Sequence, residues 1–367
     1  MKLRCITMLL GIGLGFAAQT FAQTAISPTV KSAGTISQTD LSAIKGFVQA
    51  QTAKLTTDDP IQQAAAREAL SNAPVAEPAA SAAFNDAYSQ AVNEAMLPVA
   101  DNASVRVRLN AAIVVSRVAA RTGTVRLKPA ALKFIADKAD PVVLWGVKAH
   151  GSLIPAQLRM QPKGDDPLLK GLVPALKGHL SSPVTQEAYE ALRLNIIQDR
   201  KNVTPEMIKA VVPVMQDLLA MRITQYQTGM PDNPLVDTIA TTFLVDADVW
   251  RQETPAQRTH TGQLIVDLIA SAAGRTASFD SDRESKDSLI QTIRLLASAA
   301  RVIADSIGKP ELGSAAMPVS KVDTSMPSAT IIKTCDELIV QLIADIPGLK
   351  QRSNGSLKPI TTAPAKL

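Results

Sequence analysis

Two stretches of the sequence follow one plan. Residues 129–142 read PAALKFIADKADPV, and residues 174–184 read PALKGHLSSPV. Each opens on proline and alanine followed by leucine and lysine, and each closes on an aspartate or serine before proline, which is the chemistry of a helix start. The closing prolines, Pro141 and Pro183, are 42 residues apart. This spacing predicts a pair of helices that recurs along the chain.

A third stretch lies upstream, where Leu97-Pro98 leads into Val107-Arg108-Leu109-Asn110-Ala111-Ala112. Together the three resemble HEAT-type helical repeats, whose units pair a proline-bearing first helix with a second that opens on Asp/Ser-Pro-x-Val-Arg-x-x-Ala. The resemblance covers about residues 79–200, although Leu144 and Gln186 replace the arginine in the other two units. It implies antiparallel helix pairs stacked as an irregular α-solenoid with a binding or scaffolding role. An irregular helical bundle is the alternative.

Composition agrees with an all-α protein. Apolar residues make up 46% of the 367-residue chain, yet only 12 residues are Phe, Tyr or Trp. Ala, Val, Leu and Ile must therefore fill the interior, which suits closely approaching helices. Helical periodicity predicts helices over 39–54, 59–72, 79–97, 103–121, 129–138, 141–154, 167–181, 184–199, 205–228, 234–249, 256–273, 281–307 and 329–346. Alternating strand patterns are nearly absent, so we expect no sheet.

The first 22 residues have the pattern of a secretory signal peptide. Lys2 and Arg4 precede an uncharged, largely apolar run from Cys5 to Ala18, and Thr20-Phe21-Ala22 supplies a small-residue cleavage site. The leader resembles those of Gram-negative bacteria. We therefore expect an exported protein, periplasmic or extracellular or associated with the envelope, with no transmembrane helix once the leader is cleaved. An uncleaved leader that anchors the protein is an alternative.

The rest of the chain divides by composition. We expect a flexible segment over 23–37, a helical-repeat domain over 38–308, a proline-containing linker over 309–328, a C-terminal helix over 329–348 and a disordered tail over 349–367. Only Cys335 remains after cleavage, so no intramolecular disulfide can form. Cys335 lies on the helical stripe Ile331, Cys335, Leu338, Leu342, Ile346, which predicts a core position.

Charge is unevenly distributed along the chain. Residues 55–101 hold seven acids and one base, whereas residues 102–136 hold seven bases and no acid. Arg106, Arg117 and Arg121 share one helical stripe with Asn110, and this stripe is the candidate face for an anionic partner. Alternatively, acidic helices pack beside basic ones and the two blocks neutralise each other. Adjacency in the sequence favours neutralisation.

No motif for catalysis, for a cofactor or for a metal stands out. His150, His179 and His260 belong to no cluster with ligand spacing, and a net charge of +5, or +3 after leader cleavage, is too small to imply nucleic-acid binding. The sequence favours a non-enzymatic exported protein that binds or scaffolds another macromolecule of the cell envelope, a protein or an anionic envelope component. The alternative is an enzyme whose site is assembled only by the fold. The oligomeric state cannot be predicted.

Overall fold

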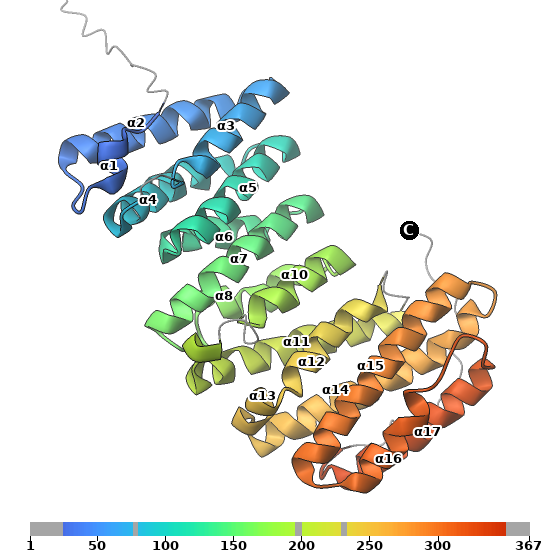
Figure 1. Cartoon of the computed structure of the whole chain (residues 1–367). Coiled ribbons are helices and arrows are strands. Elements are labelled where there is room, and N and C mark those ends of the chain that lie inside the picture. Colours follow the sequence, from blue (N-terminus) through green and yellow to red (C-terminus); the bar gives the residue numbers. More distant parts are fainter. Residues whose placement is uncertain (1–24, 76–79, 195–199, 229–232, 350–367) are drawn as a thin grey trace, which may run out of the picture.

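The computed structural model describes residues 25–75, 80–194, 200–228 and 233–349. Within these ranges all regular secondary structure is helical and no strand occurs, as the sequence predicted. The helices lie side by side in a bent stack that runs from α1 at one end to α17 at the other (Figure 1). None of them has an apolar stretch sufficient to cross a bilayer.

The chain order is as follows. The α-helices are α1 (Pro28–Ser32), α2 (Gln38–Leu55), α3 (Pro60–Asn72), α4 (Ala82–Val99), α5 (Val105–Thr122), α6 (Lys128–Ile135), α7 (Asp140–Met160), α8 (Pro167–Lys170), α9 (Leu172–Leu176), α10 (Ser182–Leu192), α11 (Pro205–Thr228), α12 (Asp237–Leu244), α13 (Ala247–Gln252), α14 (Pro255–Arg275), α15 (Arg283–Ile307), α16 (Pro310–Val319) and α17 (Ser328–Asp345). Short 3₁₀ helices η1 (Val125–Leu127), η2 (Arg200–Asn202), η3 (Pro234–Val236) and η4 (Thr276–Phe279) occur between them.

From α2 to α7, each helix packs against the helix two further along, and most also pack against a neighbour in sequence. One layer contains α2, α4 and α6, and the other contains α3, α5, α7 and α10. Beyond α10 the same alternation continues with irregular pairs, in which α11 packs on α14 and α12 on α15. The fold is thus an irregular α-solenoid of antiparallel helix pairs.

The two repeat stretches occupy equivalent places. Asp140-Pro141 opens α7 and Ser182-Pro183 opens α10, and the two helices pack against each other in the same layer. The backbones of α6 and α7 also approach closely, because a Cβ atom on Gly146 would lie 2.7 Å from the backbone nitrogen of Ile135.

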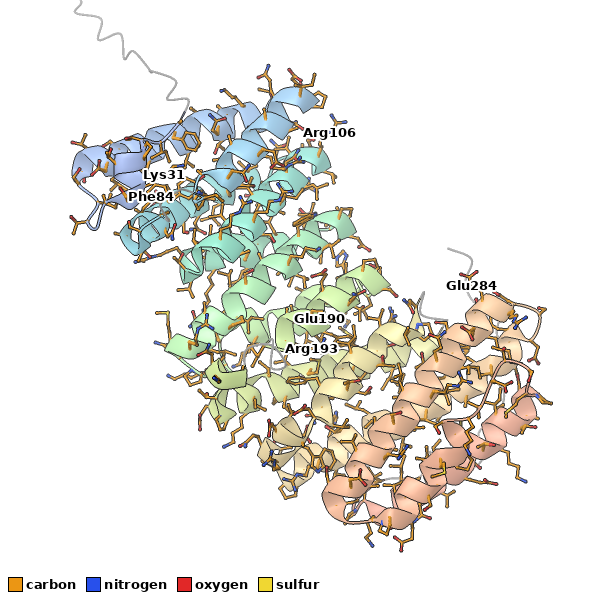
Figure 2. The ribbon with its side chains drawn as sticks, in the orientation of Figure 1. Lys31, Phe84, Arg106, Glu190, Arg193 and Glu284 are labelled. Carbon is orange, nitrogen blue, oxygen red and sulfur yellow. The ribbon has the colours of Figure 1, made fainter. Side chains whose placement is uncertain are left out.

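The predicted flexible segment over 23–37 is wrong for the residues that the structure describes. Ser27 caps α1, Pro28 opens it, and the Ile26 side chain is buried. The Ser81 backbone N–H donates to the Lys31 carbonyl oxygen at 2.8 Å, which holds the segment against the start of α4. Figure 2 labels Lys31 of α1 and Phe84 of α4. The predicted signal peptide and nearly all of the predicted C-terminal tail lie outside the described residues.

The predicted linker over 309–328 is also wrong, because it contains α16. Pro310 lies in the first turn, where a missing N–H costs nothing, and Pro318 lies in the last turn. Leu312, Ala316 and Val319 are buried, so the helix has an apolar face that packs on α15 and α17. The predicted C-terminal helix is present as α17.

Two predicted helices are broken. The span 167–181 divides into α8 and α9, since Pro174 cannot bond to the carbonyl of Lys170 and its ring clashes with that group. The span 234–249 divides into η3, α12 and the start of α13. In both places short elements replace one long helix, and the stack loses its regular period.

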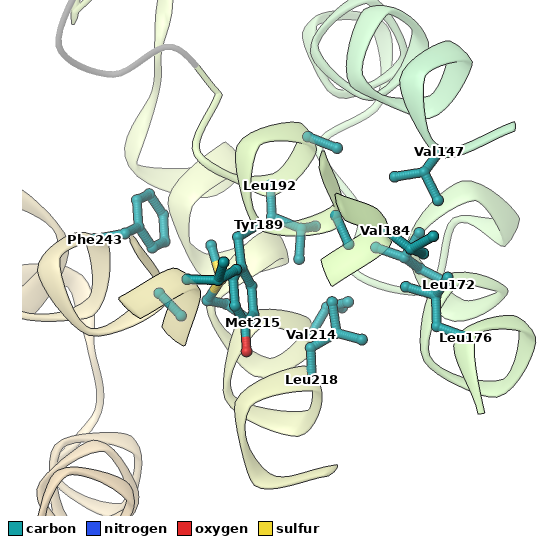
Figure 3. Close-up of a cluster of buried hydrophobic side chains, with 14 of the residues drawn as sticks. Val147, Leu172, Leu176, Val184, Tyr189, Leu192, Val214, Met215, Leu218 and Phe243 are labelled. Carbon is teal, nitrogen blue, oxygen red and sulfur yellow. The ribbon is translucent and has the colours of Figure 1, made fainter. Parts of the chain in front are cut away.

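A single hydrophobic core runs through the whole stack, from Ile26 to Ile346. Aliphatic side chains and alanine dominate it, as composition predicted. Figure 3 shows part of it, where side chains of α7, α9, α10, α11 and α12 interdigitate. Cys335 is fully buried in α17 with the rest of its predicted stripe, and burial raises the pKa of its thiol to about 12. The predicted core position of Cys335 is confirmed.

Candidate binding face on α3 and α5

The sequence-predicted arginines lie along the seam between α3 and α5. Arg106, Arg117 and Arg121 project from α5, and Arg67, which the sequence analysis did not single out, projects from α3. We call these four residues, together with Glu68, the arginine face. Arg106 is exposed in the first turn of α5 (Figure 2).

One carboxylate serves two of the four guanidinium groups. Arg117 Nη1 lies 2.7 Å from Glu68 Oε1, and Arg67 Nη2 lies 3.3 Å from the same oxygen. The hydrogen bond from Arg117 is the largest cause that lowers the pKa of Glu68. These pairs are partly exposed to solvent, so each contributes only about 0–1 kcal/mol to stability.

Arg121 binds the end of α3 instead of an acid. It donates to the carbonyl oxygen of Ser71 and, at 2.8 Å, to Asn72 Oδ1. A guanidinium group is favourable here because the last carbonyl groups of a helix are unsatisfied and carry partial negative charge. The charge of Arg121 is therefore oriented but not neutralised by a carboxylate.

Asn110 has a different role from the arginines. Its side chain is buried between the two helices, where Oδ1 accepts from Arg67 Nη1 at 3.0 Å and Nδ2 donates to Gln63 Oε1 at 3.3 Å. Asn110 thus positions Arg67 and does not itself face solvent.

The acidic side chains of α4 and of the turn after it form ion pairs outside the arginine face. Asp86 pairs with Arg126 at 2.8 Å, Asp101 with Lys133 at 2.5 Å and Glu94 with Lys45 at 3.0 Å. The two charge blocks therefore neutralise each other only in part. In the described ranges the arginine face keeps four guanidinium groups around one carboxylate, and neither Arg106 nor Arg121 forms an ion pair.

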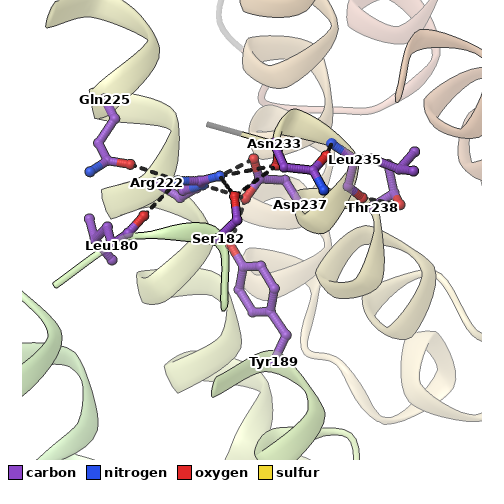
Figure 4. Close-up of polar contacts among 9 residues, drawn as sticks. All are labelled: Leu180, Ser182, Tyr189, Arg222, Gln225, Asn233, Leu235, Asp237 and Thr238. Atoms are coloured by element: carbon purple, nitrogen blue, oxygen red, sulfur yellow. Dashed lines mark hydrogen bonds and ion pairs between the residues drawn. The ribbon is translucent and has the colours of Figure 1, made fainter. Parts of the chain in front are cut away.

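A second polar cluster lies in the interior, where α10, α11 and α12 meet (Figure 4). Arg222 Nε lies 3.1 Å from Asp237 Oδ1, Arg222 Nη1 donates to the Leu180 carbonyl oxygen at 2.7 Å, and the Tyr189 hydroxyl donates to Asp237 Oδ1 at 3.1 Å. All three side chains are fully buried. This cluster, the Arg222–Asp237 hub, joins helices and offers nothing to a ligand in solution.

Two other titratable groups are perturbed by burial. Desolvation lowers the pKa of His150 to about 4, and its Nδ1 bonds to the Gly146 carbonyl oxygen at 2.8 Å. Desolvation raises the pKa of Glu253 to about 8. Their exposed fractions are 0% and 4%, so neither presents its side chain to a substrate. The described residues contain no group of three or more His, Cys, Asp or Glu side chains that could hold a metal ion.

No protein-family model matches the sequence, and no curated protein matches it. Among solved structures, the chain is similar to three engineered proteins of the Northeast Structural Genomics Consortium. The first is 14% identical over 81% of this chain and 98% of its own, with a TM-score of 0.33. The second is 14% identical over 82% and 80%, with a TM-score of 0.35, and the third is 16% identical over 81% and 97%, with a TM-score of 0.31. Scores this low carry no argument about fold or function.

Proposed function

We propose that this chain is an exported, non-enzymatic helical-repeat protein of the HEAT type that binds or organises another macromolecule of the cell envelope. The arginine face is the part of its surface that contacts the partner. The observation that supports this proposal is the surplus of guanidinium groups on α3 and α5, which remains after the neighbouring acids have formed their own pairs.

The arginines are held in place before a partner arrives. Asn110 fixes Arg67, Glu68 fixes Arg117, and the end of α3 fixes Arg121. Fixed side chains lose less conformational entropy on binding, and guanidinium groups bind carboxylate or phosphate oxygens through two hydrogen bonds at once. The partner is therefore a protein or an envelope component that presents carboxylate or phosphate groups.

The test compares two double variants with the same change in charge. Arg106→Glu with Arg121→Glu reverses the arginine face, and Arg283→Glu with Arg301→Glu reverses two exposed arginines on α15. The immobilised full-length exported protein is exposed to a native envelope extract and, separately, to vesicles containing an anionic phospholipid. We expect the arginine-face variant to retain its partner at least about tenfold less well than wild type, and the α15 variant to match wild type.

Equal losses in the two variants would mean that overall charge, and not this face, governs retention. Because Arg121 also bonds to α3, its replacement can lower the stability of the fold. Arg106→Glu alone therefore serves as a second variant, and it should leave stability unchanged because the Arg106 side chain is exposed. Retention that survives both arginine-face variants contradicts the proposal. Binding to vesicles alone identifies a lipid headgroup, and binding to a component of the extract alone identifies a protein partner.

A further inference from the structure

Two hollows meet at the ends of α5 and α7, on the far side of α5 from α3. One has a volume of about 740 Å³ and lies between α4, η1, α6 and α7. The other has a volume of about 320 Å³ and lies between α5, α7 and the start of α11. Gly123 and Arg159 line both, so the two hollows adjoin at these residues, and we call the pair the Gly123 groove.

Gly123 keeps the middle of this groove open. It ends α5 in the left-handed conformation, with φ of 63°, which side chains other than glycine rarely adopt. A Cβ atom placed there would meet nothing within 4 Å. On the other wall, Pro155 inside α7 removes one backbone donor near the end of that helix.

The basic side chains that line the groove differ in whether they form an ion pair. Arg126 binds both carboxylate oxygens of Asp86, at 2.8 and 3.0 Å, and Lys128 Nζ lies 2.8 Å from Asp166 Oδ2. Arg159 is exposed where the two hollows meet, and in the ranges that the structure describes it forms no ion pair. Among the described residues, Arg159 is therefore the cation of the groove that has no carboxylate partner.

An apolar surface adjoins that cation. Met160 follows Arg159 and is 68% exposed. Val125, Pro129 and Ala156 continue the apolar lining. Methionine and arginine are enriched in the buried centres of protein interfaces, where methionine adapts its shape to a partner.

The backbone adds hydrogen-bond acceptors. The last turns of α5 and α7 both end at the groove. The Gly123 N–H donates to the Ala119 carbonyl oxygen and the Gln161 N–H to the Gln157 carbonyl oxygen, and among the described residues no backbone N–H donates to the later carbonyl groups of either helix. The remaining carbonyl groups suit the amide N–H groups of an extended chain. A simple anion would be repelled by these carbonyl groups, whereas a peptide can satisfy them and present an acid to Arg159.

We propose that the Gly123 groove binds an extended peptide segment of another protein. Apolar side chains of the peptide pack on Met160, Val125 and Pro129, and an acidic side chain of the peptide pairs with Arg159. The volume of each hollow lies within the range typical of ligand sites, about 300–1,000 Å³. The proposal does not depend on the arginine face, because no residue of that face lines either hollow.

Random peptides displayed on phage are selected for binding to the immobilised exported protein. The Arg159→Glu variant is present in solution as a competitor, so that peptides that bind elsewhere on the protein are removed. We expect enrichment of peptides in which one Asp or Glu is flanked by apolar residues. The most enriched peptide is then synthesised with a fluorescent label, and its affinity for each variant is measured by anisotropy.

Arg159→Ala should weaken this peptide by about tenfold and Met160→Ala by about threefold. Arg301→Glu on α15 and Arg106→Glu on the arginine face should leave its affinity unchanged. Both groove side chains are exposed, so the variants should keep the melting temperature of wild type. Failure to enrich any peptide, enrichment without an acidic residue, or equal affinity for Arg159→Ala would each overturn the proposal. Loss of binding only in Arg106→Glu would assign the peptide to the arginine face instead.

Discussion

Glu253 should make the protein less stable as the pH rises. The carboxyl group is buried where α13 ends against α11 and α14. The Thr261 hydroxyl donates to Glu253 Oε1 at 3.0 Å and accepts from Gln216 Nε2 at 2.8 Å. Desolvation is the largest cause of the raised pKa, while Thr261 and the charge of Arg258 oppose it.

The magnitude follows from the pKa in the two states. In the folded protein the pKa of Glu253 is about 8, against an ordinary value of 4.5 for a glutamate in solution. Between these values the unfolded chain carries a carboxylate and the folded chain a carboxylic acid, so folding takes up a proton. The stability contributed by this group is complete below about pH 4.5 and is lost as the pH rises through 8. The total loss is about 5 kcal/mol, at about 1.4 kcal/mol for each pH unit.

Glu253→Gln removes the titration while keeping the shape and the acceptor for Thr261. Urea unfolding of wild type and variant from about pH 5 to pH 9 gives the free energy of unfolding of each. The difference, variant minus wild type, should rise by about 1.4 kcal/mol per pH unit up to about pH 8 and then level off. Glu311→Gln, at an exposed position in α16, is the control and should follow wild type. Parallel curves for wild type and Glu253→Gln would refute the reasoning.

Three further predictions concern buried positions. Because burial lowers the pKa of His150 from 6.5 to about 4, this group should remove about 3 kcal/mol of stability as the pH falls through that window. The free energy of unfolding of wild type minus that of His150→Asn in urea should fall by this amount, because the opposite change from Glu253 is common to both proteins. Arg222→Met should cost about 3–5 kcal/mol in urea unfolding by leaving Asp237 uncompensated, and adding Asp237→Asn should recover most of it. Gly146→Ala should lower the melting temperature through a loss of about 1–3 kcal/mol, since its Cβ would meet the α6 backbone, whereas Gly46→Ala, with open space in the middle of α2, should gain about 0.5–1 kcal/mol.

Helix positions and core faces could be predicted from local spacing. Asp140-Pro141 and Ser182-Pro183 begin helices because the fixed dihedral angle of each proline suits the first turn, although neither helix has a side-chain cap. The stripe around Cys335 is buried because a 3.6-residue period places it on one face. The linker prediction failed because the number of prolines was weighed above their positions. Pro310 lies in the first turn of α16, where its missing N–H costs nothing, and Pro318 lies one residue before the end of the helix, where only one backbone hydrogen bond is lost.

Contacts between helices could not be predicted in the same way. Adjacency in the sequence placed the acids of α4 opposite the bases of α5. The two helices do pack together, but Asp86 and Glu94 form their pairs elsewhere, and Glu68 of α3 is the acid that meets Arg117. Arg67 was missed for the same reason, since its partner Asn110 is distant in the sequence. Arg222 was missed because an arginine on an apolar helix face shows its buried partner only after α12 has packed against α11.

The alternating contacts of the two layers also determine how the molecule responds to damage. A helix in such a stack is stabilised only by contacts with its nearest neighbours. Unfolding can therefore begin at either end and proceed one helix pair at a time. The Arg222–Asp237 hub connects three successive helices near the middle of the chain, and a buried charge pair must be broken before an advancing front can pass it. Unfolding that starts at α1 or α17 should therefore stop at the hub. The parts of the protein on either side of the hub should then unfold in separate steps.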